Sequence, residues 1–211
     1  MIFNLTMVAL LIFAAYLLGS IPTGYLVGRY LEGIDIREHG SGSTGATNVL
    51  RTVGKSAALA VLLIDALKGA IALAVVNLTY SLVPGQLPAD WHAWLITASA
   101  LSAIIGHSRS IWLNFTGGKS VATTLGVLLV MNPTVALGTI ACFAISLSIF
   151  RIVSLSSILG AIAVNVLMLA LAQPIPYCIF AAVAGIYVIL RHKTNIQRLV
   201  AGIEPKIGQA L

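Results

Sequence analysis

Long charge-free stretches of apolar residues follow one another along the chain, with short polar segments between them. A helix that crosses a bilayer core of about 30 Å needs roughly 20 such residues. The first stretch, residues 1–28, lacks the basic start of a signal peptide, so we interpret it as a retained span. Gly19 and Pro22 predict a break within it, because proline cannot continue a helix.

The second stretch, residues 56–82, is interrupted only by Asp65 and Lys68. These two residues stand three apart and so share one helix face, where they can pair. A third and shorter span is predicted at residues 91–105, with two tryptophans at its start in positions typical of an interfacial aromatic belt.

Two later charge-free stretches are each too long for one straight helix. Residues 120–150 would reach about 46 Å and residues 152–190 about 58 Å as single helices. Asn-Pro at 132–133 predicts a turn in the former, and Gln-Pro-Ile-Pro at 173–176 predicts one in the latter. The pattern therefore predicts an all-α integral membrane protein, a seven-transmembrane-helix bundle forming a single polytopic domain over residues 1–211.

Basic residues support this count, because short cytoplasmic loops accumulate lysine and arginine. Seven spans place the N-terminus outside and the C-terminus in the cytoplasm, and they leave only Lys68 within a span. Residues 120–131 are short enough to be re-entrant instead, which would move the tail to the other side. The basic residues that share the cytoplasmic side are Arg29, Arg37, Arg51, Lys55, Arg109, Lys119, Arg151, Arg191, Lys193, Arg198 and Lys206.

Composition excludes the other protein classes. Hydrophobic residues make up 59% of the 211 residues and charged residues 9%, whereas soluble domains carry roughly 25% charged residues. A soluble fold, a disordered chain and a coiled coil are therefore excluded. The net charge of +6, which in a soluble protein would suggest nucleic acid, here reflects the basic loops. Cys142 and Cys178 lie in apolar stretches and indicate neither a disulfide nor a metal site.

Three cytoplasmic segments are more polar than simple connections need to be. The first, residues 40–51, is rich in glycines and hydroxyls and ends at Arg51 before the second span. Glycines let the backbone approach a ligand, and successive amides followed by a helix N-terminus bind anions. A flexible turn is the alternative. The segment matches neither a P-loop nor a dinucleotide-binding pattern.

The second segment, residues 106–123, contains Gly117-Gly118-Lys119 at the start of a span. Backbone donors beside a lysine again predict an anion site. Alternatively, Lys119 only anchors its helix at the headgroup level. His107 alone is more typical of a packed, hydrogen-bonded residue than of a base.

The third segment, residues 191–204, follows the last span. If that helix continues, His192 and Asn195 lie three apart on one face. An amphipathic tail bound to anionic lipid is the alternative. Ser154 is a further candidate at the cytoplasmic end of its span, although serines within spans usually bond their own backbone. Together the three segments suit a phosphorylated polar substrate that meets a lipid.

These segments resemble the three signatures of the bacterial acyl-phosphate-dependent glycerol-3-phosphate acyltransferases, in the family's order. The matching residues are Gly42 to Asn48 with Arg51, then Gly106-His107 through Gly117-Gly118-Lys119, then His192 with Asn195, Arg198-Leu199, Gly202 and Glu204. Gly19 to Tyr25 and the Asp65/Lys68-Gly69 pair are also similar, so the resemblance covers nearly the whole chain. One departure is Ser43-Thr44, where the family usually has Asn, often followed by Pro.

The resemblance implies transfer of a fatty acyl group from acyl phosphate to the 1-hydroxyl of glycerol 3-phosphate, giving lysophosphatidic acid and phosphate, at the cytoplasmic face of the bacterial inner membrane. It implies catalytic roles for His192, Asn195 and Ser154, with Asn195 as oxyanion donor and either His192 or a substrate phosphate as base. The implied substrate-binding residues are Ser41, Gly42, Ser43, Gly45, Thr47, Asn48, Arg51, His107, Gly117, Gly118 and Lys119. The expected partners are both substrates and membrane lipid, with no cofactor, metal, nucleic acid or obligate protein partner.

Two functions of other classes compete with this one. A transporter for a phosphorylated solute would explain anion sites and the intramembrane Asp65 and Lys68, but it predicts internal repeats, and none is evident. A scaffold with a lipid-binding basic tail would not need the glycine-rich segments. No Ser-His-Asp set, paired carboxylates or metal-ligand cluster is recognisable, which favours direct transfer over a covalent acyl-enzyme.

Overall fold

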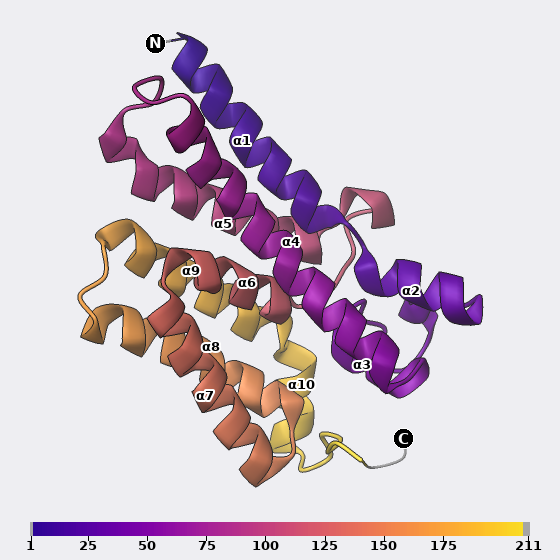
Figure 1. Cartoon of the computed structure of the whole chain (residues 1–211). Coiled ribbons are helices and arrows are strands. Elements are labelled where there is room, and N and C mark those ends of the chain that lie inside the picture. Colours follow the sequence, from indigo (N-terminus) through magenta and orange to yellow (C-terminus); the bar gives the residue numbers. More distant parts are fainter. Residues whose placement is uncertain (1, 209–211) are drawn as a thin grey trace. The chain divides into compact units, whose positions relative to one another are not determined.

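The computed structural model describes residues 2–208, with side chains described from Asn4 onward (Figure 1). Regular structure in this part of the chain is helical, apart from one isolated antiparallel bridge between Ser110 and Thr116. The chain divides into two compact units, Met1–Met131 and Asn132–Leu211. The helices are α1 (Ile2–Ser20), α2 (Thr23–Glu32), η1 (Ile36–Glu38), α3 (Ala46–Thr52), α4 (Lys55–Leu82), η2 (Ala89–Trp91), α5 (His92–Ser108), η3 (Ile111–Leu113), α6 (Val121–Met131), α7 (Pro133–Phe150), α8 (Val153–Ala170), α9 (Ile175–Arg191) and α10 (Lys193–Val200).

In the first unit, α1 packs against α5 and α4, and α4 also packs against α6 (Figure 1). The α4 and α6 backbones touch at two glycines: a Cβ on Gly69 would overlap the Thr123 carbonyl oxygen, and one on Gly126 the Ala66 carbonyl oxygen. Small residues at membrane helix interfaces allow this close packing.

The predicted break in the first stretch is confirmed, since α1 ends at Ser20 and α2 begins at Thr23. The helix break at Pro22 leaves the carbonyls of Ser20 and Ile21 without the amide donors that a continuing helix would supply. Side chains supply these donors. Ser110 Oγ donates to the Ser20 carbonyl at 2.6 Å, and Lys68 Nζ donates to the Ile21 carbonyl at 2.7 Å.

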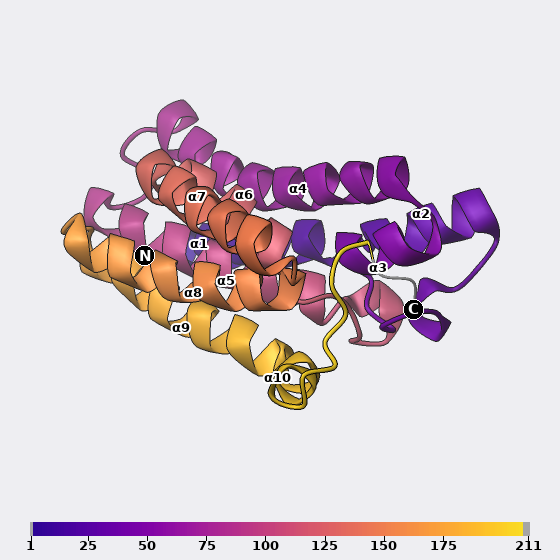
Figure 2. The same cartoon turned by 90° about the horizontal axis from the view of Figure 1, so that it is seen from below.

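In the second unit, α8 packs against both α7 and α9 (Figure 2). The turn predicted at 132–133 is confirmed, because Asn132 caps α7 and its Oδ1 accepts from the Val135 amide at 3.0 Å. The break predicted at 173–176 is confirmed between α8 and α9. The last helix does not continue straight beyond the last span, since α9 ends at Arg191 and α10 leaves at a bend of 61°.

Within residues 2–208, length and composition make four helical segments able to cross a membrane, and five if α9 and α10 count as one bent span. Large apolar side chains cover their outer faces, as in Leu10 and Leu169, which are 62% and 70% exposed. Helix α5 has 17 residues and α6 has 11, or about 26 and 16 Å of rise. The count of seven spans and the orientation of the termini therefore stay predictions.

Candidate active site

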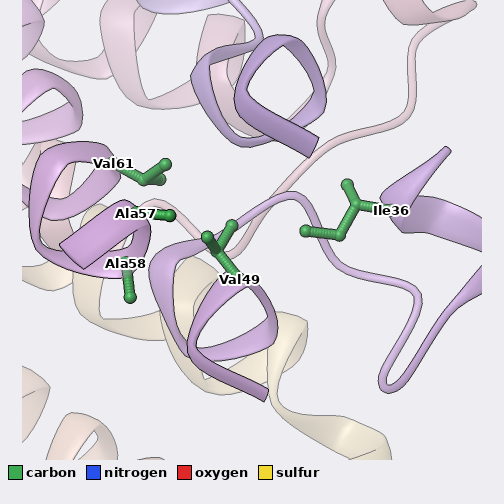
Figure 3. Close-up of a cluster of buried hydrophobic side chains, with 5 residues drawn as sticks. All are labelled: Ile36, Val49, Ala57, Ala58 and Val61. Atoms are coloured by element: carbon green, nitrogen blue, oxygen red, sulfur yellow. The ribbon is translucent and has the colours of Figure 1, made fainter. Parts of the chain in front are cut away.

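A small apolar core fixes the first polar segment to the rest of the first unit. It consists of Ile36 from η1, Val49 from α3, and Ala57, Ala58 and Val61 from α4 (Figure 3). All five side chains are buried, and Ile36, Val49 and Val61 are fully so. Burial of this apolar surface holds η1 and α3 against the start of α4, so the loop between them has fixed ends.

Asn48 organises the loop from the inside. Its Oδ1 accepts from the Ser41 amide at 2.8 Å, and a Cβ on Gly40 would overlap this oxygen. Gly40 and Gly42 have φ of +59° and +68°, a conformation that favours glycine. The Asn48 Nδ2 donates to the carbonyls of Ile36, His39 and Ser43 at 3.0, 3.0 and 2.9 Å. The side chain predicted to contact phosphate is instead buried and engaged in holding the loop.

The outer part of the loop carries the remaining candidates. Ser41 and Gly42 are exposed, while Ser43, Gly45 and Thr47 are half-buried. Ser43 Oγ accepts from the Gly45 amide at 3.3 Å, which gives this departure from the family pattern a local turn-forming role. Helix α3 starts just after Gly45, whose carbonyl accepts from the amides of Asn48 and Val49 at 3.0 and 3.3 Å.

Arg51 lies in the last turn of α3 and is half-buried. It stands four residues after Thr47, so the two side chains share one helix face. The next residue after each of these two, Asn48 and Thr52, lies beside Gly40 of the loop. Within α3, Thr52 Oγ1 donates to the Asn48 carbonyl at 2.9 Å.

The second polar segment folds back over the end of α5. Gly118 donates its amide to the His107 carbonyl at 3.3 Å. A Cβ on Gly117 would overlap the same carbonyl oxygen, and a Cβ on Gly118 would overlap His107 Nε2. Both glycines are therefore needed for the segment to lie against His107. The half-buried Lys119 follows, two residues before α6 begins at Val121.

His107 is buried, with 6% of its side chain exposed, and lies between this segment and α4. Its Nδ1 is 3.5 Å from Asp65 Oδ1. Asp65 Oδ1 is also 2.8 Å from Lys68 Nζ, which confirms the predicted pair. The predicted phosphate contact of His107 is not supported by this position. The alternative of a packed histidine describes it better.

Arg37 lies just before the first polar segment and contacts the second. Its Nη1 donates to Thr116 Oγ1 at 3.4 Å, and its guanidinium lies 5.3 Å from the centre of the Tyr25 ring. Arg37 also pairs with Asp35 through Nη2 at 2.6 Å. The hydrogen bonds between the two side chains lower the pKa of Asp35 and raise the pKa of Arg37. The sequence pattern did not indicate this link, because Arg37 lies outside the three segments.

In the second unit, Glu204 gathers the candidates of the third segment. Its Oε1 accepts from Ser154 Oγ at 2.7 Å and from Asn195 Nδ2 at 2.6 Å. Its Oε2 accepts from Arg198 Nε at 2.7 Å. Ser154 therefore bonds a distant carboxylate, and the expectation of a bond to its own backbone is wrong.

Burial raises the pKa of Glu204, but the hydrogen bonds from Asn195, Ser154 and Arg198 and the charge of Arg198 outweigh it. The net result is a pKa below that of an ordinary glutamate, so the carboxylate is ionised at neutral pH. Sequence reasoning gave Glu204 no role. An acidic residue in an otherwise basic segment could have suggested a buried role for Glu204. Its partners, however, are determined only by the fold.

His192 is buried at the junction of α9 and α10, with 2% of its surface exposed. Its Nδ1 is 2.7 Å from the Val188 carbonyl oxygen. A carbonyl only accepts, so Nδ1 carries the proton and Nε2 carries the lone pair when the ring is neutral. Among residues 2–208, no group of three or more His, Cys, Asp or Glu side chains is arranged to hold a metal.

A family model described as Glycerol-3-phosphate acyltransferase matches residues 9–202. A protein of that name from Rippkaea orientalis is 67% identical over 203 residues, covering 96% of this chain and 94% of the relative. Another from Synechocystis sp. is 58% identical over 201 residues, covering 94% of this chain and 90% of the relative.

Two solved structures are also similar, both of PlsY (YgiH), an integral membrane glycerol 3-phosphate acyltransferase. The glycerol 3-phosphate form has a TM-score of 0.86 at 34% identity and covers 95% of this chain and 96% of that one. The lysophosphatidic acid form has a TM-score of 0.83 at 34% identity and covers 95% of each chain. The prediction of an all-helical membrane protein is confirmed, and the chain belongs to the glycerol-3-phosphate acyltransferase family.

Proposed function

We propose that this protein transfers a fatty acyl group from acyl phosphate to the 1-hydroxyl of glycerol 3-phosphate, giving lysophosphatidic acid and inorganic phosphate. The main support is the likeness, over 95% of the chain, to a structure of PlsY in a glycerol 3-phosphate form and to one in a lysophosphatidic acid form. The first is a form with an acyl acceptor, and the second is a form with an acylated product. Acyl phosphate as the donor rests on the resemblance of the three polar segments.

The reaction exchanges one oxygen for another at the acyl carbon. The 1-hydroxyl oxygen forms a bond to the carbonyl carbon, and the bond from that carbon to the phosphate oxygen breaks. The electron pair leaves with phosphate, and the hydroxyl proton passes to a base. Negative charge develops on the carbonyl oxygen in the transition state, where a positioned donor contributes roughly 3–4 kcal/mol.

Phosphate binding is assigned to the first unit. Arg51 supplies charge, and Thr47 lies on the same face of α3. Ser41 contributes a hydroxyl donor from the outer loop, while Gly42 and Gly45, whose amides bond His39 and Ser43, shape that loop together with Asn48. Lys119 supplies the second cation, and Gly117 and Gly118 allow its segment to lie against His107. Bound phosphate carries about −1.5 to −2 charge, so these cations are needed at a membrane boundary.

Acyl transfer is assigned to the second unit. The ionised Glu204 orients Asn195 and Ser154 by accepting a hydrogen bond from each. The amide of Asn195 is a hydrogen-bond donor, and we assign it to the developing oxyanion.

The base is either His192 or a phosphate of the substrates. Neutral His192 has its lone pair on Nε2, which suits proton acceptance. A bound phosphate, with a second pKa near 6, is the other acceptor. The pH profile of His192→Gln separates the two. If His192 is the base, the variant loses the lower limb of the kcat profile, whereas a phosphate base preserves it at a reduced rate.

The donor is tested with purified protein in detergent, supplied with glycerol 3-phosphate and either acyl phosphate or acyl-CoA. We expect an acylated product with acyl phosphate and none with acyl-CoA, and NMR should place the acyl group on the 1-hydroxyl. If only acyl-CoA is turned over, or if neither donor is turned over, the proposal is rejected.

The proposed setting is the bacterial inner membrane, with seven spans and the polar segments on the cytoplasmic side. The distribution of basic residues supports it. Gln86→Cys and Thr194→Cys, at exposed positions in a background without Cys142 and Cys178, provide the test. An impermeant thiol reagent added to whole cells should label position 86 and not position 194. Labelling of both would contradict this topology.

A further inference from the structure

We infer that the buried Asp65, Lys68 and His107 form a positioning cluster that sets the Gly117–Lys119 segment for binding substrate phosphate. The inference rests on the proposed function for the identity of the ligand. It differs from that function in assigning no substrate contact to these three side chains. They act through the ring of His107, which the segment lies against.

The cluster is deeply buried in the first unit. Asp65 is 1% exposed, Lys68 4% and His107 6%. Charged groups in this environment are stable only when paired, and ionisable residues within membrane spans usually serve a function. Lys68 is paired twice, with Asp65 Oδ1 at 2.8 Å and with the Ile21 carbonyl at 2.7 Å. The cluster thus ties α4 to the break between α1 and α2.

The ring of His107 connects this ion pair to the glycine segment. Its Nδ1 edge faces Asp65 at 3.5 Å, and its Nε2 edge faces Gly118 so closely that a Cβ there would overlap the nitrogen. The ring is therefore confined from both sides. Movement of Asp65 or loss of its charge releases the Nδ1 edge, and the segment against the Nε2 edge loses its support.

Gly118 itself points to this arrangement. Its φ is negative, so alanine meets no backbone strain at this position. What opposes alanine is overlap with the His107 ring. The backbone amide of Gly118 also donates to the His107 carbonyl at 3.3 Å, which ties the segment to the end of α5 at a second point. A displaced ring would thus displace the Gly117–Lys119 segment, and with it the Lys119 side chain that we assign to phosphate.

A matched control lies at the other end of the same two helices. His92 Nε2 is 2.8 Å from Asn77 Oδ1, so this pair also joins α5 to α4. His92 stands 15 residues before His107, about 22 Å along the helix. Asn77→Ala removes a polar contact between the same helices without touching the glycine segment.

The experiment compares Asp65→Asn and Lys68→Met with Asn77→Ala in the full-length protein. We expect both cluster variants to raise the KM for glycerol 3-phosphate about tenfold, which corresponds to about 1.4 kcal/mol, with kcat changed less than threefold. Hydrogen exchange of the 115–121 peptide, measured without substrate, should become faster. Asn77→Ala should lower Tm and leave both readouts unchanged.

Two further variants keep the test decisive. If Asp65→Asn does not fold, Gly118→Ala displaces the ring from its other edge and should raise KM and hydrogen exchange in the same way. Where both fold, the Asp65→Asn/Gly118→Ala double variant should resemble the worse single variant, because both changes act through the His107 ring. Unchanged KM and exchange in folded cluster variants would overturn the inference. If wild-type protein shows no turnover of glycerol 3-phosphate, the proposed function fails, while exchange at 115–121 still decides the positioning role.

Discussion

The carboxylate of Glu204 should be a main source of stability in the second unit, and Glu204→Gln tests this with little change in shape. In the structure, Oε1 accepts from Ser154 and Asn195, and Oε2 accepts from Arg198. Glutamine replaces one of these oxygens by an amide group that can only donate. In either orientation, at least one donor then faces another donor, and the charge that attracts Arg198 is lost.

The expected loss follows from these contacts. A hydrogen bond to a charged group contributes about 1.5–3 kcal/mol, and a buried donor left unsatisfied costs a similar amount. The side chain of Arg198 is 35% exposed, so water weakens the contribution of its ion pair with Glu204 to stability. We expect a loss of about 2–4 kcal/mol, or roughly 4–16 °C in Tm for a chain of this size.

The effect should depend on pH in one direction. The pKa of Glu204 in the folded protein lies below the ordinary value of about 4.3. Stability from a group with a lowered pKa is present above its unfolded pKa and is lost as the pH falls through its folded pKa. The Tm difference between wild type and Glu204→Gln should therefore be constant from about pH 8 to 6 and shrink below about pH 4.3.

Thermal unfolding in detergent across this pH range measures the effect, with Glu32→Gln as the control. Glu32 is exposed, so its variant should keep the wild-type Tm. An equal Tm for wild type and Glu204→Gln at pH 7 would refute the reasoning. So would a Tm difference that stays the same at pH 4.

Other variants separate binding from catalysis. Arg51→Ala and Lys119→Ala should each raise the KM for a phosphorylated substrate about tenfold or more with a smaller change in kcat, as measured by phosphate release, and the reverse pattern would remove them from binding. Asn195→Ala should lower kcat about 10²–10³-fold as an oxyanion donor, so an unchanged kcat in a folded variant would contradict that role. Asn48→Ala should lower stability by about 1–3 kcal/mol and also raise KM, because the loop loses its internal hydrogen bonds; a stable variant with wild-type KM would argue against this.

Much of the helical architecture was predictable, because it depends on local properties of the chain. Proline at 22 and 133 marks helix boundaries by chemistry that acts within a few residues. The Asp65–Lys68 pair follows from helix periodicity alone. Family membership was likewise predictable from the order of the three polar segments, and the family model confirms it.

The contacts that organise the site depend on long-range packing and were not predictable. Glu204 meets Ser154 across 50 positions of sequence, which no local pattern encodes. Asn48 looks like a phosphate ligand in a glycine-rich loop, but its partners are the carbonyls of the loop itself. The bend at His192 has no proline or glycine to mark it. Instead, the ring of His192 bonds the Val188 carbonyl of the last turn of α9.

Direct acyl transfer, without a covalent intermediate, is tested by rapid mixing of the purified protein with acyl phosphate before glycerol 3-phosphate is added. Free phosphate should appear only after glycerol 3-phosphate is added, in a one-to-one ratio with acylated product. A burst of one equivalent of phosphate before the acceptor is added would instead indicate a covalent acyl-enzyme and contradict direct transfer. Absence of phosphate release with both substrates present would contradict the activity itself.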